Sequence, residues 1–109
     1  MSLTLTANQT FNQDGKFISA LKIPHSTNTS GWGSLLLPVI IIRNGDGPSV
    51  LFTGGNHGDE YEGPIALRKL ANELKVEDIQ GQVIIVPYLN FPAILAGTRL
   101  SPVDGLNMN

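Results

Sequence analysis

The 109-residue chain contains no cysteine, which excludes both a disulfide framework and a zinc site built from thiolates. Its seven lysines and arginines are scattered, whereas nucleic-acid binding requires basic side chains gathered on one surface. The longest apolar run, residues 35–42, is interrupted by Pro38. It is also shorter than the roughly 20 residues that a membrane-spanning helix needs. We therefore expect neither a nucleic-acid partner nor a membrane partner.

The start of the chain also lacks the pattern of a secretory signal peptide, which is a basic stretch followed by an apolar one. Hydrophobic residues make up 41% of the chain and charged residues 15%, with a net charge of -2. This balance is typical of a globular core rather than of a disordered tail. These features predict a cytoplasmic protein, and the length suffices for one small domain.

Local patterns predict three strands in the first half of the chain, at residues 17–23, 35–43 and 49–53. A dense turn signal, which begins at Asn44-Gly45, separates the second strand from the third. Two apolar runs joined by Asn-Gly predict an antiparallel hairpin. The segment between the first two strands is polar and begins at His25, which we expect to be exposed.

The second half of the chain predicts a helix and then a buried strand. Apolar residues recur at helical spacing within residues 64–74, at Leu67, Leu70, Ala71 and Leu74. Residues 82–87 have an apolar centre that is typical of a strand buried on both faces. A strand, a helix and a strand in close succession predict a crossover onto a parallel pair. The predicted fold class is therefore α/β with a mixed sheet and a crossover helix.

The segment between the third predicted strand and the helix carries the candidate chemistry. It contains His57 and Glu60, whose imidazole and carboxylate are both ordinary zinc ligands. Their spacing in a turn allows both side chains to reach one ion, and Gly58 allows the backbone to bend between them. Ligands bind at the carboxyl ends of strands in open α/β sheets, which is where this segment lies. The alternative reading is a solvated polar loop without a metal.

Two blocks of sequence resemble the succinylglutamate desuccinylase/aspartoacylase family, whose members are related to zinc carboxypeptidases. The first block is Gly54-Gly55-Asn56-His57-Gly58-Asp59-Glu60. The second comprises Asn90-Phe91-Pro92-Ala93, Arg99 and Asp104-Gly105-Leu106-Asn107-Met108-Asn109. The resemblance covers roughly residues 15–109, and it is greatest to the branch that includes N-acetyl-diaminobutyrate deacetylase. Segments 24–26, 30–33 and 57–64 carry the likeness to this branch.

The resemblance implies a role for each matching position. His57 and Glu60 correspond to the first two ligands of a single Zn²⁺. Arg99 corresponds to the arginine that grips the carboxylate of a small N-acyl amino acid, and Asn109 to the asparagine beside it. A guanidinium suits that role because its fork forms two parallel hydrogen bonds with a carboxylate. The implied activity is hydrolysis that removes an acetyl- or succinyl-type acyl group.

The same resemblance implies that the site is incomplete in this chain. The third zinc ligand and the general-base glutamate of the family are expected after residue 109, so no catalytic residue is assigned here. His25 is not expected to supply a ligand. Residues 1–109 are then the N-terminal portion of one catalytic domain with an α/β/α, zinc carboxypeptidase-like fold, in which residues 1–16 are a polar lead-in. Such a fragment alone should be inactive.

One position departs from the family pattern, and two others have a simpler interpretation. Asn107 is found where many members of the family have aspartate, so the role of that carboxylate is in doubt here. Asn90 and Asp104 are expected to structure their loops, since short polar side chains bond to nearby backbone groups.

Three other interpretations remain open. A zinc carboxypeptidase acting on peptides would share the ligand spacing, and a non-catalytic binding module would keep the fold without the metal. An independently folded small domain would have a complete core, whereas an unpaired sheet edge and exposed apolar surface would indicate part of a larger fold. Assembly into a homo-oligomer is also left open by the sequence.

Overall fold

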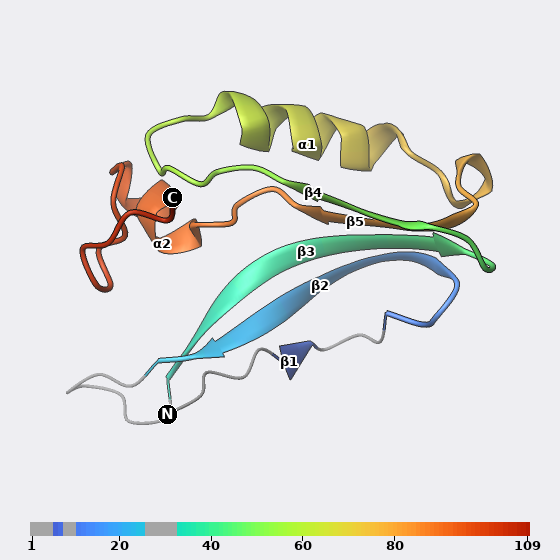
Figure 1. The fold of residues 1–109 in the computed structure, drawn as a ribbon, viewed down its shortest axis with the longest axis horizontal. Helices are drawn as coiled ribbons and strands as arrows, with labels where there is room; N and C mark the ends of the chain where they lie inside the picture. The colour runs from blue at the N-terminus through green and yellow to red at the C-terminus, as the bar shows by residue number, and fades with distance from the viewer. Residues whose placement is uncertain (1–5, 8–10, 26–32) are drawn as a thin grey trace.

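The computed structural model describes residues 6–7, 11–25 and 33–109, which form a sheet and two helices (Figure 1). The strands are β1 (Thr6–Ala7), β2 (Gly15–Pro24), β3 (Ser34–Asn44), β4 (Ser49–Thr53) and β5 (Gly81–Val86). The helices are α1 (Glu62–Glu73) and α2 (Phe91–Ala96), with the 3₁₀ turn η1 (Val76–Asp78) before β5. No helix in these described ranges has both the length and the apolar character needed to cross a membrane.

The sheet is mixed and has the strand order β1-β2-β3-β5-β4 within the described residues. β2 pairs with β3 and β3 with β5 in antiparallel fashion, whereas β4 and β5 are parallel. Helix α1 connects the two parallel strands. The predicted fold class and crossover are therefore confirmed, and the predicted helix begins two residues earlier and ends one residue earlier than expected.

The predicted hairpin between residues 35–43 and 49–53 is wrong, because β5 lies between β3 and β4. The segment Val83-Ile84-Ile85 is apolar on both faces, and a central position buries both of them. The turn passes closely over the start of β5. A Cβ on Gly81 would lie 2.3 Å from the carbonyl oxygen of Pro48, and the Gln82 N–H donates to that oxygen at 3.0 Å. The local turn signal was correct, but the pairing across it was not.

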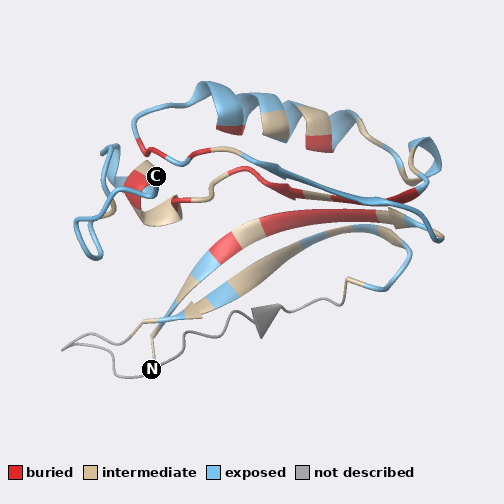
Figure 2. Cartoon of the chain, in the orientation of Figure 1, coloured by how far each residue is buried: buried red, intermediate tan, exposed pale blue. Residues whose placement is uncertain are grey.

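Each face of the sheet buries alternate residues of β3 and β5, where the buried positions concentrate (Figure 2). One face packs beneath α1, and its buried members are Ile40, Ile42, Ala71, Val83 and Ile85. The opposite face buries Leu37, Val39, Ile41 and Val86. Pro38 is tolerated within β3 because β5 pairs only with the later part of that strand, from Ile40 onward. The two faces form the core that positions the loops at the strand ends.

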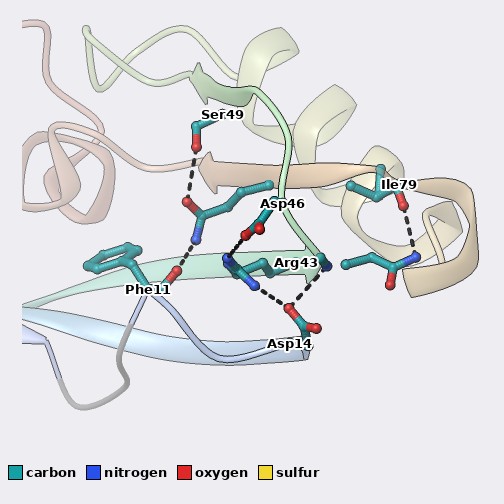
Figure 3. Close-up of polar contacts among 9 residues, drawn as sticks. Phe11, Asp14, Arg43, Asp46, Ser49 and Ile79 are labelled. Carbon is teal, nitrogen blue, oxygen red and sulfur yellow. Dashed lines mark hydrogen bonds and ion pairs between the residues drawn. The ribbon is translucent and has the colours of Figure 1, made fainter.

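The turn end of the sheet is fixed by polar contacts (Figure 3). Arg43 forms an ion pair with Asp14 and lies 3.4 Å from a carboxylate oxygen of Asp46. The Asn44 amide donates to the carbonyl oxygen of Ile79 at 3.0 Å. The C-terminal loops and α2 lie at the other end of the sheet (Figure 1). The candidate site residues are therefore remote from this polar cluster.

The outermost strand, β4, exposes apolar side chains. All of its residues are exposed, including Leu51 at 61% and Phe52 at 40%. Ile65 on α1 is also 67% exposed. An unpaired apolar edge of this kind is normally covered by further protein. These exposed surfaces are the features expected of part of a larger fold rather than of a complete small core.

Candidate metal centre

Two segments meet at the carboxyl ends of the parallel strands β4 and β5. Hydrogen bonding between them continues beyond the strands. The Gly54 N–H donates to the Val86 carbonyl at 3.0 Å, and the Leu89 and Asn90 N–H groups donate to the Gly54 and Gly55 carbonyls at 2.8 and 2.9 Å. The loop of residues 54–60 is therefore held beside the start of the C-terminal segment. This is the edge at which open α/β sheets bind ligands.

Gly58 brings the loop into contact with α2. A Cβ at this position would lie 2.1 Å from the Ala93 carbonyl and 2.3 Å from the Thr98 carbonyl oxygen. Gly58 does not have a positive φ, so the predicted need for a tight bend is not the reason for glycine here. The reason is the absence of space for a side chain.

Helix α2 was not predicted, although its sequence contains helix-end signals. Pro92 lies in its first turn, and Gly97 ends the helix in the left-handed conformation with φ of 67°. The helix is short, so its apolar period could not be recognised. It matters because the close contact with Gly58 supports the loop that carries His57 and Glu60.

The imidazole of His57 and the carboxylate of Glu60 face each other. His57 Nδ1 lies 3.3 Å from Glu60 Oε2, and His57 is only 7% exposed. A tetrahedral zinc ion with bonds of about 2.1 Å to both atoms would separate them by about 3.4 Å. The observed separation fits two ligands of one such ion. The sequence prediction that these side chains converge is consistent with this geometry.

The other nitrogen of His57 contacts Asn107. Nε2 lies 3.1 Å from Asn107 Oδ1, which also accepts the Asn109 backbone N–H at 3.0 Å. The backbone donor identifies this amide atom as the oxygen, so Nε2 carries a hydrogen and donates it. Nδ1 is then the nitrogen that a metal would bind, in place of any hydrogen that Nδ1 shares with Glu60. Asn107 thus supplies the outer acceptor that orients a metal-binding histidine, a role that the sequence left in doubt.

Glu60 is also paired with Arg99. Arg99 Nη1 donates to Glu60 Oε1 at 3.1 Å, while Oε2 faces His57. Hydrogen bonding from His57, and to a lesser extent from Arg99, lowers the pKa of the Glu60 carboxyl below its ordinary value. Glu60 is therefore ionised at neutral pH. Its carboxylate uses one oxygen for each neighbour.

The structure thus brings together three of the four predicted site residues. The fourth, Asn109, donates its backbone N–H to Asn107 beside them. Among the residues that the structure describes, no group of three or more histidine, aspartate or glutamate side chains could hold a metal. His57 and Glu60 would therefore be a partial ligand set.

The prediction that His25 is exposed is wrong. β2 continues to Pro24, so His25 follows at the end of the sheet and is half-buried. Its backbone N–H donates to the Gly33 carbonyl at 2.9 Å. Together with Asn107 it lines a pocket of about 450 Å³ that does not include His57 or Glu60.

Asp104 structures its own loop, as predicted, whereas the Asn90 side chain bonds a distant loop instead of nearby backbone. Asn90 is 2% exposed, and its amide donates to the carbonyl oxygen of Asn56 at 3.3 Å, directly before His57. Asp104 accepts the Leu106 backbone N–H at 3.0 Å. Asn90 therefore fixes the backbone that leads into the candidate metal centre.

Comparison with known proteins identifies the class. Residues 46–109 match the family model for the succinylglutamate desuccinylase/aspartoacylase catalytic domain. The chain belongs to this family, as the resemblance implied. The match contains both the loop with His57 and Glu60 and the segment with Arg99 and Asn107.

Individual relatives are similar over almost the whole chain. The N-alpha-acetyl-L-2,4-diaminobutyric acid deacetylase of Halomonas elongata is 51% identical over 96% of this chain and 31% of its own length. The product-bound ectoine utilization protein EutE (DoeB) of Ruegeria pomeroyi is 50% identical with a TM-score of 0.90, over 94% of this chain and 32% of its own. A succinylglutamate desuccinylase/aspartoacylase from Rhodobacter sphaeroides is 48% identical with a TM-score of 0.87, over 94% of this chain and 31% of its own length. The chain therefore spans about a third of the length of these relatives.

We expect Gly58→Ala in the intact protein to lower the free energy of unfolding by about 3 kcal/mol, the upper end of overpacking costs, because the contacted atoms are backbone atoms. Gly63→Ala is the matched control, since its Cβ would meet nothing closer than 3.5 Å. Its stability should be unchanged or rise by up to about 1 kcal/mol. Chemical denaturation measures both, and equal stabilities of the two variants would contradict the proposed close contact.

Replacing Asn107 by leucine removes the acceptor for His57 Nε2–H and should reduce zinc affinity about 10- to 100-fold. Asn107→Asp preserves an acceptor oxygen and should bind zinc at least as tightly as the parent protein. Competition with a chelator measures both affinities. Unchanged affinity in the leucine variant would show that Asn107 does not orient the histidine.

Proposed function

We propose that the intact protein is a zinc-dependent hydrolase that removes the acyl group from an N-acyl amino acid. The observation that carries this proposal is the 3.3 Å separation of His57 Nδ1 and Glu60 Oε2 at the carboxyl end of β4. The family match supports an acyl-removing hydrolase, and the donor set supports the metal. The third ligand and the general-base glutamate are proposed to lie outside this chain, so residues 1–109 alone should be inactive.

In this proposal, different residues of the chain hold the ion and the substrate. His57 and Glu60 would hold the metal, and Asn107 would maintain the orientation of the imidazole. A bound zinc supplies a Lewis acid for the amide carbonyl and lowers the pKa of water. We assign Arg99 and Asn109 to the substrate's carboxylate. Binding it there would place the acyl amide beside the ligands, and correct positioning supplies a large part of catalysis.

The substrate is proposed to be N-α-acetyl-L-2,4-diaminobutyrate. Support comes from the 51% identity with the deacetylase that is named for this compound. The proposed partner is therefore a small molecule, as for the relative named for this compound. We place the enzyme in the cytoplasm, in keeping with the absence of cysteine.

His57→Ala in the intact protein should abolish stoichiometric zinc binding and release of acetate together, because the ion loses a buried ligand. His25→Ala is the control, since His25 lines a pocket that includes neither His57 nor Glu60, and its replacement should leave zinc content unchanged. Elemental analysis and an acetate-release assay provide the two readouts. Retention of zinc and full activity in the His57 variant would refute the ligand assignment.

Arg99→Ala should raise KM for the acetylated amino acid about 10- to 100-fold, as expected for loss of a hydrogen-bonded charge. Arg68→Ala is a suitable control, because Arg68 is an exposed arginine of α1 that hydrogen-bonds the Tyr88 hydroxyl. Steady-state kinetics of both variants provide the comparison. A KM for the Arg99 variant equal to that of the parent protein would eliminate the anchoring role.

A further inference from the structure

Asn90 occupies the N-cap position of α2, but its side chain does not cap that helix. It makes no cap hydrogen bond, although asparagine is among the residues that cap helices best. Instead, Nδ2 donates to the carbonyl oxygen of Asn56, which lies 34 positions earlier, at 3.3 Å. A carbonyl oxygen only accepts, so the amide atom in this contact is the nitrogen. The buried Asn90 side chain therefore serves the loop of residues 54–60 rather than its own helix.

Asn90 holds two consecutive carbonyl groups of that loop. Its backbone N–H donates to the Gly55 carbonyl at 2.9 Å, and its side chain donates to the Asn56 carbonyl. The second carbonyl belongs to the peptide group that joins Asn56 to His57. Because a peptide group is planar, a bond to its oxygen also restricts the directions of the His57 N–H and Cα. Asn90 therefore acts on His57 through the backbone.

His57 is restrained at its ring as well as at its backbone. The ring nitrogen Nε2 contacts Asn107 at 3.1 Å, and His57 is 7% exposed. Asn90 and Asn107 also border the same pocket of about 450 Å³. One amide restricts the main chain of His57 and the other restricts its imidazole. Together these contacts determine the direction in which Nδ1 is presented.

We propose that Asn90 is a positioning residue for the metal centre, because it fixes the backbone from which His57 presents Nδ1 to the ion. This inference rests on the proposed function, since it requires a metal at His57. Groups that hold ligands in place before the metal binds contribute to metal affinity although they do not touch the ion. Loss of the Asn90 donor should therefore weaken zinc binding while every ligand is retained.

Two substitutions in the intact protein separate this role from helix capping. Asn90→Asp keeps the size and the capping ability of the residue, but at about pH 8 the ionised carboxylate has no hydrogen to donate. Asn90→Leu also removes the donor, without adding a charge. The matched control is Asn44→Asp, because the Asn44 amide likewise donates to a distant backbone carbonyl, that of Ile79, but at the other end of the sheet (Figure 3).

Zinc affinity is measured by competition with a chelator, and the arrangement of the ligands by the visible absorption of the cobalt(II)-loaded protein. Both Asn90 variants should bind zinc about tenfold more weakly than the parent, the lower end of the range for groups that support a ligand. Both should also show an altered cobalt spectrum. Asn44→Asp should match the parent in both measurements. Thermal unfolding of each variant verifies that it is folded.

The positioning role is overturned if both Asn90 variants bind zinc like the parent. A loss in the leucine variant alone would indicate an effect through α2, and a loss in the aspartate variant alone an effect of the buried charge; either result also overturns it. So does an equal loss in Asn44→Asp. If the parent itself binds no stoichiometric zinc, the proposed function fails. If the parent binds zinc and the Asn90 variants match it, the positioning role alone is wrong.

Discussion

The parallel pairing of β4 with β5 is the constraint on which the site depends. It continues past the strand ends through the carbonyls of Gly54 and Gly55, so the two loops that follow are held side by side. One loop carries His57 and Glu60, and the other carries Arg99 and Asn107. Without this pairing, residues that are up to 50 positions apart in the sequence would not meet. The buried faces of β3 and β5 make the pairing stable.

Electrostatics at the site follow from that arrangement. His57 lies between two acceptors, the Glu60 carboxylate and the Asn107 amide oxygen. The hydrogen on Nε2 is donated to the Asn107 amide oxygen. A metal bound to Nδ1 would lie between the imidazole and the Glu60 carboxylate. A neutral imidazole is therefore compatible with both neighbours. The neutral amide of Asn107 is sufficient to accept the hydrogen on His57 Nε2. Asn107 therefore supplies the acceptor that the histidine requires.

Local patterns in the sequence predicted strands β2 to β5, helix α1 and the crossover, because each depends on residues close together, whereas β1 within the expected polar lead-in was missed. They failed where a distant segment decides the outcome. The Asn44-Gly45 signal could not show that β5 inserts beside β3. The contacts of His57 with Asn107 and of Glu60 with Arg99 join residues far apart in the sequence, so spacing could not predict them. The close approach of α2 to Gly58 could not be predicted for the same reason. His57 and Glu60 were recognisable because both lie within one turn.

The most direct test is anomalous diffraction at the zinc absorption edge from crystals of the intact protein with zinc. The account predicts a single peak within about 2.0–2.2 Å of both His57 Nδ1 and a carboxylate oxygen of Glu60. Asn107 should remain on Nε2. A zinc peak bound through Nε2, or one that contacts neither side chain, would contradict it.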